Sequence, residues 1–222
     1  MCGRFALSHV PIFLLERYGL LDPIKAPRYN IAPTRHTPVI IRRAGESPEL
    51  ESMHWGLVPS WSRDMALAAR LINARADTVD EKRSFRDAFR WRRCLVPASG
   101  FYEWRREGGD RTPHYFSASD ETAPLVFAGL WELWTRSGHG VYSFTIITTE
   151  ANATVAPVHD RMPVILPPAD WDEWLDPDNH HVPALKALLR PAAEGTLHCW
   201  PVGPHVNNSR NDGKECITRI PE

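Results

Sequence analysis

Five strand-like segments between Cys94 and Thr149 decide the fold: CLVP (94–97), FYEWRR (101–106), HYFSA (114–118), LVFAGLWELW (125–134) and VYSFTIITT (141–149). Each is rich in β-branched and aromatic residues, and Gly, Pro, Asp and Ser separate them, which is typical of strands joined by turns. Strands in succession, with helices towards the ends of the chain, predict an α+β domain. We expect a largely antiparallel, barrel-like β core flanked by short helices.

Shorter elements are predicted on both sides of this block. Ser8 and Asp80 are in position to cap two helices. Apolar residues follow each of them at roughly helical spacing: Ile12, Leu14, Leu15 and Tyr18 after the first, and Phe85, Ala88, Phe89 and Trp91 after the second. The sequence also predicts a rigid loop at 27–34 (PRYNIAPT), a strand at 39–41, a strand running into a loop at 54–61, helices at 170–175 and 182–189, and a closing strand at 196–202.

Length and composition favour one globular domain spanning residues 1–222. The chain is 43% hydrophobic and 24% charged, so it can bury a core. No stretch approaches the ~18 apolar residues of a membrane span, and residues 1–5 (MCGRF) do not begin a secretory signal. We therefore expect no membrane contact, and we expect a cytoplasmic monomer.

The charge excludes one class of nucleic-acid-binding protein. A net charge of −1 and a pI near 6.8 do not fit a protein that coats nucleic acid by bulk charge, but they permit a local basic groove. Only four basic residues are lysines, and arginine is the better residue for bidentate phosphate contacts. GC-rich coding would give the same bias, so both interpretations stay open.

Several common chemistries lack their motifs. Cys2, Cys94, Cys199 and Cys216 are far apart and form no CxxC pair, which indicates reduced thiols rather than a zinc ribbon. The chain has no GxGxxG or Walker loop, no HExxH, no HxE with PCxxC and no GxSxG. We expect no metal and no cofactor.

Cys2 is the first candidate for chemistry. Removal of Met1 would expose an α-amine, with a reference pKa of about 7.7–8.0, beside a thiol with a pKa of about 8.5. Such a 1,2-aminothiol condenses with an aldehyde to an imine, and the thiol then closes a five-membered thiazolidine. The alternative is that Cys2 is an ordinary terminal residue.

Three polar residues within apolar or aromatic strings are further candidates. Glu103 lies between Tyr102 and Trp104, where a raised pKa would suit a general acid or base, unless strand alternation turns it to solvent. His159 precedes an apolar run and is either a proton shuttle or a structural residue. Asn73 follows two apolar residues, so its amide either braces the core or orients a ligand.

In combination, eight strings resemble the SRAP (SOS response-associated peptidase-like) family, abasic-site-processing proteins of bacteria and eukaryotes. The matching strings run almost end to end: MCGRF (1–5), RYNIAPT (28–34), WGLVPSW (55–61), INARAD (72–77), RRCLVPASGFYEW (92–104), AGLWE (128–132), FTIITTEAN (144–152) and HDRMPVIL (159–166). The resemblance implies that Cys2 forms a thiazolidine cross-link with the ring-opened sugar of an abasic site in single-stranded DNA. It assigns ring opening and amine positioning to Glu103, proton transfer and adduct reversal to His159, and orientation of the adduct to Asn73.

The same resemblance implies a binding path for the DNA strand and implies no metal site. The path would be formed by Arg4, Asn30, Pro33, Trp61, Arg75, Trp104, Thr149 and Arg161. Arginines would meet phosphates there, and aromatic residues or proline would stack or wedge against bases.

Three hypotheses about function follow from the sequence. The first is covalent capture of abasic sites in single-stranded DNA, which protects the lesion during the DNA damage response. The second is a cysteine-type peptidase or autopeptidase that uses Cys2, Glu103 and His159. The third is a non-catalytic single-stranded DNA-binding module.

Overall fold

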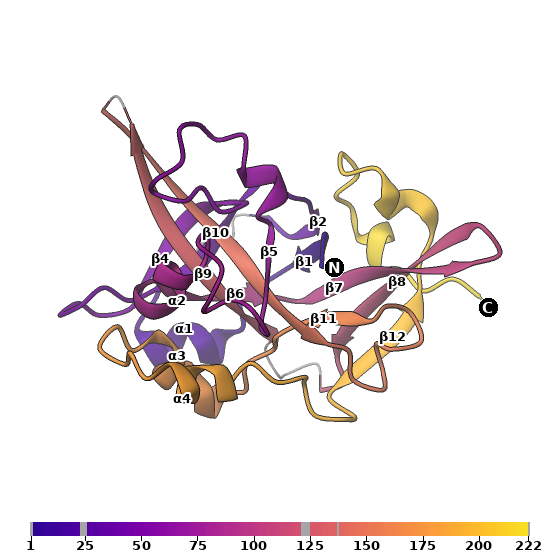
Figure 1. The fold of residues 1–222 in the computed structure, drawn as a ribbon. Helices are drawn as coiled ribbons and strands as arrows, with labels where there is room; N and C mark the ends of the chain where they lie inside the picture. The colour runs from indigo at the N-terminus through magenta and orange to yellow at the C-terminus, as the bar shows by residue number, and fades with distance from the viewer. Residues whose placement is uncertain (1, 23–25, 121–124, 137, 222) are drawn as a thin grey trace.

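The computed structural model describes residues 2–22, 26–120, 125–136 and 138–221. Its strands form two sheets (Figure 1). The first sheet has the order β12-β8-β7-β1-β2 and contains β1 (Phe5–Leu7), β2 (Arg28–Ile31), β7 (Gly100–Glu107), β8 (Asp110–Ala118) and β12 (Leu197–Pro201). The second contains β3 (His36–Ile41), β4 (Glu49–Trp55), β5 (Asn73–Arg75), β6 (Arg93–Ala98), β9 (Leu125–Arg136), β10 (His139–Glu150) and β11 (Arg161–Pro163).

Five strands of the second sheet close into a ring. β3 pairs with β4 and β6, β6 pairs with β9, β9 pairs with β10, and β10 returns to β4. All of these pairings are antiparallel except β4 with β10, so the predicted α+β class with a largely antiparallel, barrel-like core is confirmed. The last residues of β10 extend beyond the ring and pair with β5 on one side and β11 on the other.

Aromatic residues fill the ring and fix the N-terminal strand against it. Phe5 of β1 is fully buried, with its ring centroid 5.1 Å from that of Trp55 and 6.1 Å from that of Phe127. Trp55 in turn stacks on Phe144 of β10 at 6.3 Å. Burying a Phe side chain contributes roughly 1.5–3 kcal/mol. Phe5 therefore anchors β1, and with it the position of Cys2.

Two glycines permit close approaches between strands. A Cβ on Gly129 of β9 would lie 2.7 Å from Cys94 Sγ, and one on Gly100 would lie 2.3 Å from the Tyr115 ring. Real Cβ atoms do not approach so closely, so larger residues would force β9 from β6 or β7 from β8.

The α-helices are short: α1 (Ile12–Tyr18), α2 (Arg86–Trp91), α3 (Trp171–Leu175) and α4 (Val182–Ala187). Single 3-10 turns are η1 (Ala68–Arg70), η2 (Pro168–Asp170), η3 (Pro204–Asn207) and η4 (Lys214–Ile217). In Figure 1, α1, α3 and α4 gather at one end of the barrel, whereas the β7–β8 hairpin and the C-terminal segment lie on the opposite side. None of the helices in the described ranges is long and apolar enough to cross a membrane.

Arg93 joins the helical end to the barrel. It is 3% exposed, and its guanidinium donates to the carbonyl oxygens of Trp174, Phe89, Arg90, Asp176 and Asn179. Burial lowers the pKa of this arginine to about 10. One side chain thus satisfies carbonyls of α2, of α3 and of the segment after α3 that would otherwise be buried without partners.

Most predicted elements are present, but both predicted helix caps are wrong. Ser8 Oγ forms hydrogen bonds with Ser99 Oγ and His9 Nδ1. Helix α1 begins after Pro11 and has no side-chain cap. Asp80 accepts a hydrogen bond from Lys186 Nζ at 2.7 Å and lies well before the start of α2. In each case the side chain that was predicted to cap a helix forms a hydrogen bond with a residue distant in sequence instead. The loop predicted at 27–34 is also partly wrong, because residues 28–31 form β2.

Candidate functional site

Cys2 lies just before β1 and is completely buried. Its carbonyl oxygen accepts a hydrogen bond from Asn73 Nδ2 at 2.8 Å. Burial raises the pKa of the Cys2 thiol far above its ordinary range, the negative charge of Glu103 raises it further, and a hydrogen bond from the Arg4 backbone opposes this. The thiol is therefore protonated near neutral pH and needs a base before it can act as a nucleophile.

Asn73 reaches Cys2 because β5 is held in a fixed register. Asn73 pairs with Ile146 of β10, and the carbonyl of the preceding residue, Ile72, accepts from Trp55 Nε1 at 2.9 Å. Asn73 Oδ1 is buried and has no hydrogen-bond partner within the described part of the chain. An acceptor atom thus remains available for a donor bound next to Cys2.

Glu103 faces the interior from β7, so the solvent-facing alternative considered from the sequence is wrong. The residue is 3% exposed, and burial raises the pKa of its carboxyl to about 7. Its strand pairs with β1 through Phe5 and Phe101, and Tyr102 N–H donates to Arg4 O, which brings Glu103 beside residues 2–4. A carboxyl that titrates near neutrality suits proton transfer in either direction.

His159 completes the group from the turn before β11. Its Nε2 lies 3.9 Å from Glu103 Oε2. Its Nδ1 lies 3.0 Å from the backbone N–H of Arg161 and 2.9 Å from Asp160 Oδ1. Burial lowers the pKa of His159, which favours the neutral ring. The Arg161 N–H favours the tautomer with its proton on Nε2, facing Glu103, whereas the Asp160 carboxylate favours a proton on Nδ1.

These four residues meet beside a cleft of about 790 Å³. Gly3, Glu103 and His159 line it, so Cys2 lies directly behind its wall. The rest of the lining is strongly basic and includes an aromatic residue: Arg4, Trp104, Arg105, Arg106, Arg111, Pro157, Val158 and Asn207. Within the described ranges, no group of three or more His, Cys, Asp or Glu side chains is arranged to hold a metal ion.

Arg4 is held in place at the cleft by Asn30. Arg4 Nη1 donates to Asn30 Oδ1 and to Val206 O, both at 2.7 Å. Asn30 is 1% exposed, and its Nδ2 donates to the carbonyls of Val206, Asn208 and Asn211. The amide of Asn30 therefore fastens the C-terminal segment and orients Arg4, and its polar atoms are occupied by the protein itself.

Trp104 also lies at the cleft, in contact with two polar residues. Its Nε1 donates to Asn207 Oδ1 at 2.7 Å, and the Arg4 guanidinium lies 5.9 Å from its ring centroid. Sequence reasoning missed Asn207, Arg106 and Arg111 as cleft residues. Their charge and polarity were visible in the sequence, but no pattern indicated which surface they would share.

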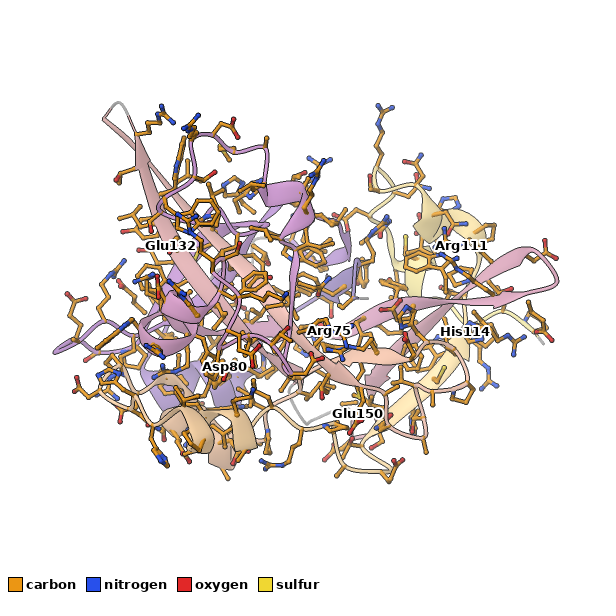
Figure 2. The ribbon with its side chains drawn as sticks, in the orientation of Figure 1. Arg75, Asp80, Arg111, His114, Glu132 and Glu150 are labelled. Atoms are coloured by element: carbon orange, nitrogen blue, oxygen red, sulfur yellow. The ribbon has the colours of Figure 1, made fainter. Side chains whose placement is uncertain are left out.

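Three further candidates meet at a second hollow of about 410 Å³. Arg75, Thr149 and Arg161 line it, because β10 carries Thr149 between β5 and β11. Arg75 donates to both oxygens of Asp77, at 3.1 and 2.9 Å, and Arg161 Nη2 donates to Thr148 O. Figure 2 labels Arg75 here and Arg111 on the β7–β8 hairpin, well apart from each other.

Pro33 and Trp61 lie outside both hollows. Pro33 precedes Thr34, whose φ of 71° places a β-branched residue in the left-handed region. Such backbone strain concentrates at functional sites. Trp61 is 42% exposed, and the Arg83 guanidinium stacks 4.4 Å from its ring centroid at the edge of a third hollow. The structure therefore brings together Cys2, Asn73, Glu103 and His159, while Pro33 and Trp61 stand apart.

Comparison with known proteins decides the family. The model of the SOS response associated peptidase (SRAP) family matches residues 1–209. The chain belongs to the SRAP family. Among SRAP relatives, it is 36% identical to the abasic site processing protein YoqW of Bacillus subtilis, over 98% of this chain and 99% of YoqW. It is 34% identical to the abasic site processing protein HMCES of Xenopus tropicalis, over 87% of this chain and 66% of HMCES.

Solved structures share the fold of this chain. A crystal structure of a Bacteroides thetaiotaomicron protein superposes with a TM-score of 0.87 and 28% identity, covering 99% of this chain and all of that one. A Bordetella bronchiseptica phage-related protein gives a TM-score of 0.72 at 31% identity, with 90% and 94% coverage. The family predicted from the eight sequence strings is confirmed.

Proposed function

We propose that this protein, once Met1 is removed, captures abasic sites in single-stranded DNA covalently through Cys2. The observation that carries the proposal is the convergence of Cys2, Asn73, Glu103 and His159 beside an arginine-lined cleft. The names of the relatives YoqW and HMCES, both abasic site processing proteins, support the choice of lesion.

The chemistry begins at the amine. The ring-opened sugar presents an aldehyde, the Cys2 amine adds to its carbon, and loss of water leaves an imine. The sulfur then adds to the imine carbon, its proton passes to a base, and the imine nitrogen gains a proton. A thiazolidine closes without any other leaving group, and the second step gains from proximity because it is intramolecular.

Each neighbouring residue has a role in this sequence. Glu103, with a pKa of about 7, takes the thiol proton and assists opening of the sugar ring. His159 exchanges protons with Glu103 and with the departing water, and in reverse it assists release of the adduct. Asn73 holds Cys2 through its carbonyl and offers Oδ1 to a donor on the adduct.

An abasic site fits such a place for an energetic reason. No base has to be unstacked before the sugar enters the cleft, whereas an intact nucleotide would have to be extruded at a cost of a few kcal/mol. The guanidinium groups of Arg4, Arg75 and Arg161 would hold the flanking phosphates. Trp104 would stack against a neighbouring base.

The test uses a uracil-containing oligonucleotide treated with uracil glycosylase, and protein whose intact mass shows that Met1 is absent. We expect a heat-stable shifted band on a denaturing gel with the wild type and none with Cys2→Ala. Cys2→Ala is a matched control because it keeps the amine. Its imine should therefore be trapped only when borohydride is added.

Other results would point to the alternatives. Salt-sensitive binding without any covalent band in the wild type would indicate a non-catalytic DNA-binding module. A heat-stable band of equal yield in Cys2→Ala would refute thiazolidine formation. Retention of Met1 in Glu103→Gln, but not in the wild type, would indicate self-processing.

A further inference from the structure

The β7–β8 hairpin carries a pair of arginines that the proposed chemistry leaves unused. Arg106 and Arg111 lie directly opposite each other across the two strands, and both are exposed. Like charges at directly opposed positions destabilise a sheet. Both residues also line the 790 Å³ cleft, so the unfavourable pair stands at its rim.

Neither of these guanidinium groups forms a hydrogen bond or an ion pair with an acidic side chain among the described residues. The neighbouring Arg105 differs, because its Nη2 lies 3.4 Å from Glu107 Oε2. Two adjacent cations that are not ion-paired to a carboxylate form a site for an external anion.

Both arginines act electrostatically on the candidate catalytic residues. Burial has the largest effect on the pKa of Glu103 and of His159, but the charge of Arg111 also acts on Glu103 and that of Arg106 acts on His159. The pair is thus close enough to the reacting groups for an anion on it to belong to the same substrate. A phosphodiester adjoining the lesion meets this requirement.

We propose that Arg106 and Arg111 clamp the phosphate backbone of the DNA strand on one side of the abasic site. The inference rests on the function proposed above and extends it. Arg75 and Arg161 line a different hollow, so the two arginine pairs would hold the strand at two separate places. Figures 1 and 2 show the two places: Arg75 ends β5, and Arg111 lies on the hairpin.

The first test measures non-covalent binding to an intact single-stranded oligonucleotide as a function of salt. Arg106→Ala/Arg111→Ala is compared with Arg86→Ala/Arg90→Ala, which removes two arginines from α2. Two lost phosphate contacts should reduce the log–log salt slope by about 1.4, at about 0.7 per contact. The α2 control should keep the wild-type slope. An unchanged slope in the hairpin variant, or an equal reduction in the control, refutes the clamp.

The second test locates the clamp along the strand. Cross-linking rates are measured at sub-saturating concentration with three abasic oligonucleotides: one extended on both sides of the lesion, one cut short on its 5′ side and one on its 3′ side. The hairpin variant should react about tenfold more slowly than the wild type on the full oligonucleotide, and as fast as the wild type on one of the short ones. Equal losses on all three would overturn the proposal.

Failure of the clamp can be told apart from failure of the proposed function. If the wild type forms no covalent product with any oligonucleotide, cross-linking is refuted while the salt slope still reports on the arginines. The variant should fold normally, because both side chains are exposed and relief of like-charge repulsion favours the sheet. Its thermal midpoint should equal or exceed that of the wild type.

Discussion

The pKa of Glu103 gives the proposed chemistry a specific pH dependence. With a pKa of about 7, the ionised fraction of this carboxyl rises from about 0.1 at pH 6 to about 0.9 at pH 8. If the carboxylate takes the Cys2 thiol proton, the cross-linking rate gains about tenfold over this interval from Glu103. Glu103→Gln keeps the shape of the side chain and removes the base, so it should lose this gain.

The α-amine titrates over the same interval and has to be separated from Glu103. With a reference pKa of about 7.7–8.0, its unprotonated fraction rises roughly 40-fold between pH 6 and pH 8 in both proteins. The informative quantity is therefore the ratio of the wild-type rate to the Glu103→Gln rate. We expect this ratio to rise about tenfold with pH and to reach about 10²–10⁴ at pH 8.

The assay is a single-turnover time course with protein in excess over an abasic oligonucleotide, quenched and resolved on a denaturing gel. Glu103→Asp is the matched control, because it keeps a carboxylate and should preserve the pH dependence of the ratio. The reasoning fails if the ratio is the same at pH 6 and pH 8, or if Glu103→Gln reacts as fast as the wild type at pH 8.

The remaining predictions concern stability and binding. Folding raises the pKa of Glu103 from 4.5 to about 7, so the folded state binds more protons than the unfolded state between these pH values. The free energy of unfolding should therefore fall as pH rises through this window, by on the order of 3 kcal/mol. Urea unfolding at pH 5 and pH 8 checks this, and Glu103→Gln should lack the loss; an identical pH dependence in the variant contradicts it. Arg93→Met leaves five carbonyl oxygens without their buried donor. In a urea titration, the variant should lose at least about 3 kcal/mol of its free energy of unfolding. A loss below about 1 kcal/mol would show that the carbonyls find other partners. Asp77→Asn frees Arg75 from its carboxylate and should tighten non-covalent binding to single-stranded DNA a few-fold, with a steeper salt slope; weaker binding would mean that Asp77 serves to orient Arg75.

The central part of the fold was predictable because its strands carry a strong local signal. The long strand β9 is mostly apolar and aromatic, β10 is rich in β-branched residues, and their pairing follows from a short connection. The parallel contact between β4 and β10 closes the ring and joins segments about 90 residues apart, which no local pattern encodes. Strands of three residues, such as β5 and β11, are too short to show a period.

The candidate site also has some features that the sequence indicates and others that depend on tertiary structure. Glu103 was recognisable as a carboxyl within an aromatic string, but its burial was not, because strand alternation could equally have turned it to solvent. The contact between Cys2 and Asn73 depends on the register of β5 against β10 and on the packing of Phe5 in the barrel. Both are tertiary interactions, which no local sequence pattern encodes. Asn30 looked like a residue of the DNA path, yet its amide hydrogen-bonds to the backbone of the C-terminal segment, which a sequence alone does not reveal.

The most direct test of covalent capture by the Cys2 amine and thiol is the intact mass of the product. Protein without Met1 is incubated with an abasic single-stranded oligonucleotide, without reductant, and its mass is compared with that of protein carrying an added residue before Cys2. We predict a species equal to protein plus oligonucleotide minus one water for the first, and none for the second. An adduct of equal yield on the blocked protein would contradict the mechanism, since its Cys2 has no free amine.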